Sequence, residues 1–166
     1  MNKQTVAPSA STAPISSNTV SSTPGLDVAT IPPGTTSTAP DSLPAGYLAG
    51  GYYATTEKGA KYLRPEFVGK YAETMATLLA GMKITDFNRL LREMKRSKKK
   101  TLPFEARLTA VSEMLPKALA LVHRKKAPAL LVSFIKHNLD NILDDDDWTA
   151  FYRHLEAIAG YMVIGG

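Results

Sequence analysis

Apolar residues recur every three or four positions from about residue 65 to the end of the chain. That stretch holds no sustained alternation of apolar and polar residues, which is the pattern of a half-buried strand. The pattern therefore predicts an all-α domain, a small antiparallel bundle of five or six helices joined by short links. Pro116 must kink or divide the third helix. The expected helix starts are Pro65, Thr85 as an N-cap, Pro103, Pro128 and the segment 145–147.

The second expected helix has the clearest division into two faces. Its apolar stripe consists of Phe87, Leu90, Leu91 and Met94. At about 100° per residue, four cations fall almost opposite that stripe and a fifth lies on its flank. They are Arg89, Arg92, Arg96 and Lys99, with Lys95 on the flank. We expect a helix that is apolar on one side and cationic on the other.

The first fifty residues differ in composition from the rest. They are built from Ser, Thr, Ala, Pro and Gly, and their only charges are Lys3, Asp27 and Asp41. Such a segment has too few large apolar side chains to offset the entropy of ordering, so we expect residues 1–50 to form a disordered tail. Residues 51–166 then form one helical domain.

The net charge of +5 conceals a larger asymmetry along the chain. Residues 51–126 contain 17 Lys and Arg against 7 Asp and Glu, whereas residues 127–166 carry a net charge of −4. A domain of this kind attracts polyanions at one end. We also consider that its acidic end meets the basic region of a neighbouring copy or subunit.

The sequence offers little for catalysis. It contains no cysteine, which removes a Cys nucleophile and fits a reducing compartment. His123, His137 and His154 lie in no catalytic or metal motif, and acid–base chemistry needs paired groups. We expect a non-enzymatic protein without a cofactor. No apolar run is long enough for a membrane span or a secretory signal, so we expect a cytoplasmic protein with no membrane partner.

Four consecutive aspartates, Asp144–Asp147, raise the question of a divalent metal site. Side chains of consecutive residues rarely converge on one ion. Acidic residues at the start of a helix are explained by N-capping and by the positive end of the helix dipole. We therefore expect no metal at this run.

A nucleic-acid backbone is the ligand that best fits the basic residues. The cationic face of the second helix, together with Lys117 and the cluster Arg124–Lys126, could line a groove for phosphates. The alternative is an ordinary solvated face, since cations near a helix C-terminus also stabilise the helix. Three further residues, Tyr52, Tyr53 and Tyr62, either stack on unpaired bases or close over a core or interface. The residues alone leave both questions open.

Several segments of the chain resemble one protein family. These segments are Tyr71–Glu73, Phe87–Arg96, Leu115–Lys117, Phe134–Asp140 and Phe151–Tyr161. Their order and spacing resemble the small-subunit family of the type III-A CRISPR effector, the Csm complex. The similarity runs from about residue 62 to residue 166, and the closing stretch is its most specific part.

This resemblance implies a five-helix subunit present in several copies, which stack into a minor filament beside a major filament of backbone subunits. The implied partners are the guide and target RNA, the backbone and large subunits of the CRISPR effector, and copies of the chain itself. In that family the small subunit helps to hold the guide–target duplex and cuts nothing. Because base pairing reads the sequence, the protein needs only contacts to phosphates and sugars.

Carried over position by position, the family's basic helix and the Arg that follows its Leu-Pro-Lys segment supply five positions. They are Arg89, Arg92, Lys95, Arg96 and Arg124. With the neighbouring cations, the predicted RNA-binding residues are Arg89, Arg92, Lys95, Arg96, Lys99, Lys117, Arg124 and Lys125. Two features depart from the family, namely the long N-terminal segment and Phe87 in place of a polar residue. The alternative function is a helical adaptor whose basic face binds acidic proteins.

Overall fold

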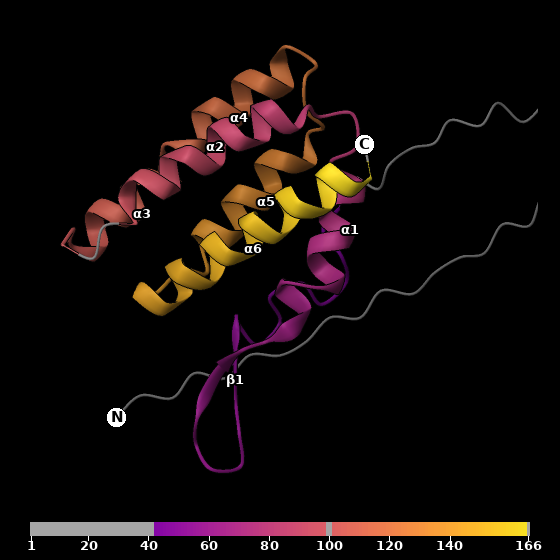
Figure 1. Cartoon of the computed structure of the whole chain (residues 1–166). Coiled ribbons are helices and arrows are strands. Elements are labelled where there is room, and N and C mark those ends of the chain that lie inside the picture. Colours follow the sequence, from indigo (N-terminus) through magenta and orange to yellow (C-terminus); the bar gives the residue numbers. More distant parts are fainter. Residues whose placement is uncertain (1–41, 99–100, 166) are drawn as a thin grey trace, which may run out of the picture. The chain divides into compact units, whose positions relative to one another are not determined.

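The fold consists of a short hairpin, one 3₁₀ turn and six α-helices within the part of the chain that the computed structural model describes, residues 42–98 and 101–165. The strands are β1 (Tyr53–Thr55) and β2 (Lys61–Leu63), and the 3₁₀ turn is η1 (Pro65–Phe67). The helices are α1 (Lys70–Leu78), α2 (Ile84–Ser97), α3 (Phe104–Ser112), α4 (Met114–His123), α5 (Leu130–Leu139) and α6 (Asp145–Ile164) (Figure 1). The predicted all-α fold class is confirmed.

Helix α6 is the longest of the described helices. It is 20 residues long and packs against α1, α2 and α3. Helix α4 packs against α2 and α5, and the long elements α2, α3–α4, α5 and α6 run in alternating directions (Figure 1). The inner side of α6 supplies the fully buried side chains of Trp148, Phe151, Leu155 and Ile158. Burial of this apolar side holds α6 against its neighbouring helices.

Proline divides the third expected helix into α3 and α4. Pro116 is the third residue of α4 and has no N–H to donate to the carbonyl of Ser112. Helix α3 ends at Ser112, and α4 begins two residues later at Met114. The division turns five helices into six and sets the direction in which α4 presents its basic residues beside α2.

Some predicted helix starts need correction. Helix α2 begins at Ile84 after an extended Lys83, without a side-chain cap, so the prediction of Thr85 as N-cap is wrong. The segment that starts at Pro65 is a 3₁₀ turn, and the α-helix begins only at Lys70. Helix α5 starts two residues after Pro128. The start of α6 at Asp145 is confirmed.

The hairpin was absent from the sequence prediction. Strands β1 and β2 pair antiparallel, with Ala54 opposite Tyr62. The turn between them is held by a hydrogen bond from the Thr56 N–H to the Ala60 carbonyl (2.9 Å), and Gly59 adopts a φ of 80° that favours glycine. Strands of three residues are too short to produce a recognisable alternation.

The folded domain begins earlier than the predicted boundary at residue 51. Most of the expected tail, residues 1–41, lies outside the described residues. Residues 42–50 are described, and both Tyr47 and Leu48 are buried in the core. The ring of Tyr47 packs edge-on against Tyr71, with ring centroids 5.4 Å apart, and against Phe67. For residues 42–50 the prediction of disorder is therefore wrong.

A buried amide ties this N-terminal segment to α5. Asn138 accepts hydrogen bonds from the hydroxyl groups of Tyr47 (3.0 Å) and Tyr52 (2.6 Å). Its own amide N–H donates to the carbonyl of Phe134 (2.7 Å). Burial raises the pKa of both tyrosines above the ordinary value. Tyr52 therefore closes over the core and does not reach solvent, so it is not free to stack on an unpaired base.

Candidate nucleic-acid interface

Helix α2 has the two faces that its sequence predicts. Phe87, Leu90 and Met94 are buried against the bundle. The cations Arg89, Arg92, Lys95 and Arg96 are exposed on the opposite side. Helix α2 also carries two acidic residues, Asp86 and Glu93, which the sequence analysis did not assign to any site. The cationic side therefore contains carboxylates as well.

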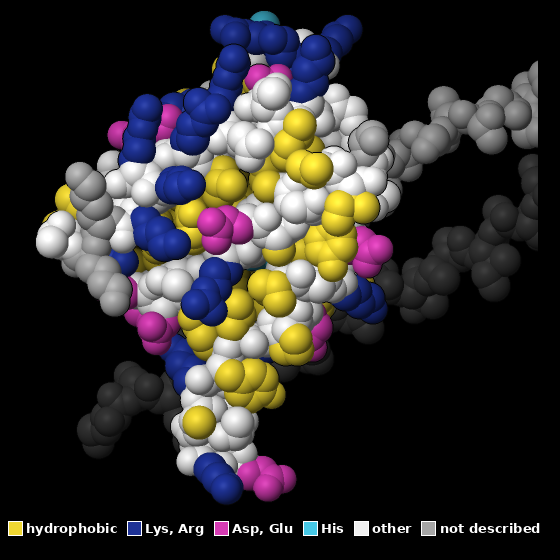
Figure 2. Space-filling model, viewed as in Figure 1, with side chains coloured by type: hydrophobic (Ala, Val, Ile, Leu, Met, Phe, Trp, Pro, Cys, Tyr) yellow, Lys and Arg dark blue, Asp and Glu magenta, His cyan; other side chains and the backbone are white. Residues whose placement is uncertain are grey.

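A groove of about 400 Å³ runs between α2 and α4. Five of the eight predicted residues line it, namely Arg89, Arg92, Arg96, Lys117 and Arg124. Leu90, Ala120 and Leu121 form its apolar part, and Asp86 and Glu93 are its acidic members. The five cations and two carboxylates give the lining a formal net charge of +3. Lys and Arg side chains gather over α2 and α4 in the upper left of Figure 2.

The spacing along α4 explains how its cations reach the groove. Lys117 and Arg124 are seven residues apart, which is two helical turns, so both lie on one face. Met114 and Ala118 on the other side are buried. Helices α2 and α4 run in opposite directions (Figure 1). Lys117 lies beside Glu93, so Arg124, two turns further along, lies toward the start of α2.

Three of the five groove cations form ion pairs. Asp86 pairs with Arg89 at 3.3 Å, and Glu93 pairs with Arg96 at 3.6 Å and with Lys117 across the groove at 3.1 Å. Among the described residues, Arg92 and Arg124 have no carboxylate within ion-pair distance. The positive charge that remains available to a ligand is therefore concentrated on these two guanidinium groups.

The remaining three predicted residues lie elsewhere. Lys95 and Lys125 are exposed but do not line the groove, and Lys99 lies outside the described residues. Lys125 follows the end of α4 with a φ of 55°. The Lys125 N–H donates to the Val122 carbonyl and the Lys126 N–H donates to the Leu121 carbonyl, both at 2.9 Å. This double hydrogen bond is a Schellman motif, in which glycine usually occupies the position of Lys125.

The acidic run at the start of α6 is held by the protein itself. Asp144 caps the helix, its Oδ1 accepting from the Asp147 N–H at 2.8 Å, and Asp147 accepts from the Leu143 N–H at 3.2 Å. Asp145 pairs with the buried Arg107, and Asp146 pairs with Lys61 at 3.2 Å. The described residues contain no group of three potential ligands arranged to hold a metal ion.

The three histidines lie in different surroundings. His154 is fully buried among Tyr47, Phe67 and Phe134, and its Nδ1–H donates to the Phe67 carbonyl. Desolvation lowers the pKa of His154 to about 4, so the ring is neutral at pH 7. His123 is exposed on α4, and His137 lies on α5 near Tyr47. His154 therefore has a structural role in the core.

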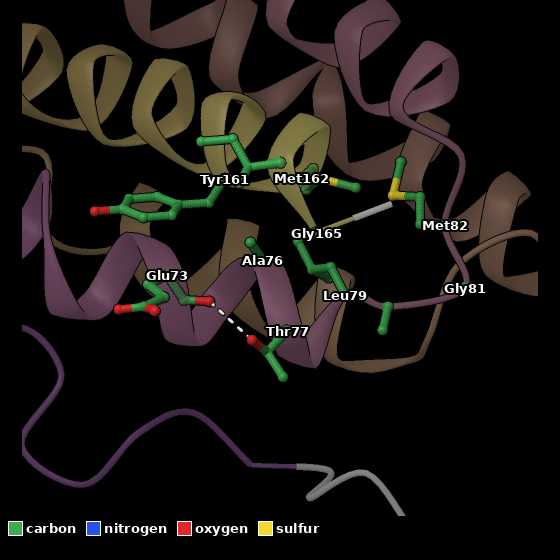
Figure 3. A pocket seen from close by; sticks show the side chains of 11 residues that line it. Glu73, Ala76, Thr77, Leu79, Gly81, Met82, Tyr161, Met162 and Gly165 are labelled. Carbon is green, nitrogen blue, oxygen red and sulfur yellow. Dashed lines mark hydrogen bonds between the residues drawn. The ribbon is translucent and has the colours of Figure 1, made fainter.

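A second pocket, of about 390 Å³, lies between α1 and the end of α6. Leu79, Met82 and Met162 point into it, and Glu73 is the only charged side chain among the described residues that line it (Figure 3). The Thr77 hydroxyl donates to the Glu73 carbonyl at 3.1 Å, a bond within the helix. The described lining has no arrangement of polar groups that suits an anion.

Of the two other tyrosines considered for base stacking, Tyr62 is 46% exposed on the hairpin. Tyr53 is half-buried, and its hydroxyl donates to the Asp146 carbonyl at 3.0 Å. Both lie on the hairpin beside the acidic start of α6, and neither lines the α2–α4 groove. The acidic neighbourhood of Tyr53 does not favour a phosphate backbone.

Comparisons with protein-family models, with curated proteins and with solved structures find no match to this chain. In the described part of the chain, every helix is too short or too polar to cross a lipid bilayer.

Proposed function

We propose that this chain is a non-catalytic RNA-binding subunit of a type III-A CRISPR effector complex, where it holds target RNA or the guide–target duplex through sequence-independent backbone contacts. The observation that carries the proposal is the α2–α4 groove, in which five predicted cations converge and two of them have no ion pair with a described carboxylate. The resemblance of the chain to the small-subunit family supplies the context. In this proposal the subunit works in the cytoplasm, takes no cofactor and assembles with backbone and large subunits and with its own copies.

The chemistry of the groove suits a phosphate backbone. Arginine is planar and donates two parallel hydrogen bonds to a phosphate, so Arg92 and Arg124 are suited to this contact. Contacts of this kind carry no sequence information, as expected where base pairing reads the target. Each phosphate neutralised on a single strand adds ~0.7 to the slope of log K against log salt. Two such contacts per copy give weak binding that strengthens when several copies bind one RNA.

The experiment compares two double variants in the reconstituted complex. Arg92→Ala/Arg124→Ala removes the two unpaired groove cations, and Lys70→Ala/Arg153→Ala removes two exposed cations outside the groove. We expect the groove variant alone to weaken target-RNA binding and to lower the salt slope by about 1.4, with assembly intact. Equal behaviour of the two variants would contradict the proposal.

A second candidate, the helical adaptor for acidic proteins, is favoured by the apolar part of the groove. Leu90 and Leu121 lie between the cations, as an acidic amphipathic segment would require. The same variants separate the two functions. Loss of assembly with unchanged RNA affinity in the groove variant would favour the adaptor.

A further inference from the structure

The two carboxylates of the α2–α4 groove have different structural explanations. Asp86 is the third residue of α2, where the positive end of the helix dipole stabilises an acidic side chain. Glu93 lies in the middle of α2, where the dipole gives no such advantage. It faces α4, and its two oxygens lie near Lys117 and Arg96. Its side chain is 22% exposed, so water screens these ion pairs only in part.

Glu93 determines which cations a ligand finds unpaired. With Glu93 charged, Arg96 and Lys117 are paired, and Arg92 and Arg124 remain. Because Glu93 lies beside Lys117 and the helices are antiparallel, Arg124 lies beside the start of α2, near Asp86. Six residues of helix separate Asp86 from Arg92, so the backbone positions that carry the two unpaired cations are about 9 Å apart along the groove.

This separation favours some anions over others. A chain of linked phosphates can place a different phosphate at each of the two unpaired cations, whereas a single phosphate must draw both long side chains together. Without the charge of Glu93, Arg92, Arg96 and Lys117 would form a cluster of three unpaired cations within four residues of α2 and its neighbour α4. Such a cluster suits a single phosphate, which accepts several hydrogen bonds at once.

We propose that Glu93 is a specificity-determining residue that makes the α2–α4 groove select a chain of linked phosphates over isolated anions. This inference rests on the proposed function and adds the class of ligand that the groove accepts. Glu93 acts by occupying Arg96 and Lys117, so the groove discriminates through the cations that it leaves unpaired.

The test measures how well inorganic phosphate displaces a labelled twelve-nucleotide oligouridine from the full chain. Sodium chloride at matched ionic strength corrects for general screening. Glu93→Gln keeps the shape of the side chain and removes its charge, and Glu93→Met is the second variant, which also removes the hydrogen bonds. The control is Glu73→Gln, which makes the same change of charge on exposed α1, outside the groove.

We expect phosphate to act on the wild type no more strongly than chloride does. In both Glu93 variants phosphate should become about fivefold more effective, the effect of ~1 kcal/mol for one charge at 4 Å in water. Both variants should also bind the oligouridine more tightly, and Glu73→Gln should behave as the wild type. Unchanged phosphate competition, the same gain in Glu73→Gln, or weaker RNA binding in the Glu93 variants would overturn the inference.

Failure of the inference and failure of the proposed function are distinguishable. The proposed function fails if the wild type does not bind the oligouridine through Arg92 and Arg124, whatever Glu93 does. The inference fails if that binding exists and the Glu93 variants leave the preference for linked phosphates intact. Thermal unfolding of each variant identifies any loss of binding that comes from loss of folding, and unfolding of both Glu93 variants would assign Glu93 a structural role and overturn the inference.

Discussion

The acidic start of α6 and the basic groove between α2 and α4 look alike in the sequence, since each is a cluster of like charges. In the structure they differ. Every aspartate of the acidic run has a partner within the protein: a backbone N–H for Asp144 and Asp147, and a cation for Asp145 and Asp146. In the groove, Arg92 and Arg124 have no ion pair with a described carboxylate. The fold uses the first cluster, whereas the second remains available for a ligand.

The comparison has a physical basis in burial. Arg107, the partner of Asp145, is 7% exposed and lies over the ring of Trp148, so its charge is held inside the domain. Its carbonyl also accepts the indole N–H of Trp148 at 3.2 Å. The groove cations Arg89 and Arg96 are about three-quarters exposed, and their ion pairs contribute little to stability.

The largest expected effect is a loss of folding stability in acid, and it involves a residue outside both charged regions. The folded state lowers the pKa of His154 from 6.5 to about 4, so the unfolded chain binds the proton more readily between those values. Stability should therefore fall by about 3 kcal/mol as the pH drops from 7.5 to 4. Urea unfolding across this range measures the loss. His154→Gln should flatten the dependence, while His123→Gln, on exposed α4, should keep it.

Loss confined to pH values below 4 would contradict the assignment of acid sensitivity to His154. Asp147 acts in the opposite direction to His154, because burial raises the pKa of its carboxyl in the folded state. A raised carboxyl pKa means that the folded state binds the proton more readily, so protonation of Asp147 favours folding as the pH falls. Acid sensitivity near pH 5 therefore points to His154.

The next effect contrasts one arginine from each region. Arg107→Ala removes the ion pair of this buried guanidinium with the exposed Asp145 and its contact with Trp148, and we expect a loss of about 2 kcal/mol. Arg92→Ala removes an exposed groove cation and should change stability by no more than about 0.5 kcal/mol. Chemical unfolding of both variants tests the pair. A comparable loss in Arg92→Ala would show that this groove arginine stabilises the folded domain.

The smallest effect has the opposite sign. Lys125 has a φ of 55°, which costs a non-glycine residue about 1 kcal/mol. Lys125→Gly should relieve this strain, but glycine loses more conformational entropy on folding than lysine does. The net result should be a domain stabilised by about 0.5 kcal/mol. Lys126→Gly, where φ is not positive, should destabilise it. If Lys125 contributes to RNA binding, the stabilised variant binds RNA more weakly; a destabilised Lys125→Gly would contradict the strain argument.

Most features of the fold that the sequence predicted correctly depend on patterns within a single helix. The three- to four-residue spacing of Phe87, Leu90 and Met94 predicted the buried face of α2 and, on the opposite side, its exposed cations. The missing N–H of Pro116 predicted the division of the third helix. Such features depend on residues no more than a few positions apart.

Contacts between distant segments could not be predicted in the same way. Glu93 lies near Lys117 only because α2 and α4 are packed side by side, and no local pattern reports that ion pair. Tyr47 and Tyr52 are buried because Asn138, far along the chain, accepts both hydroxyl groups. Composition correctly described a segment poor in apolar residues but could not show that two of its side chains fit the core.

The N-terminal segment determines where the chain can be shortened. A truncation that retains residues 42–50 keeps Tyr47 over His154 and Phe67 and keeps both hydroxyl groups that donate to Asn138. A truncation at residue 51 removes that ring, admits water to His154 and brings its pKa closer to that of a free imidazole. A domain boundary chosen from composition alone would therefore change the acid response of the protein along with its length.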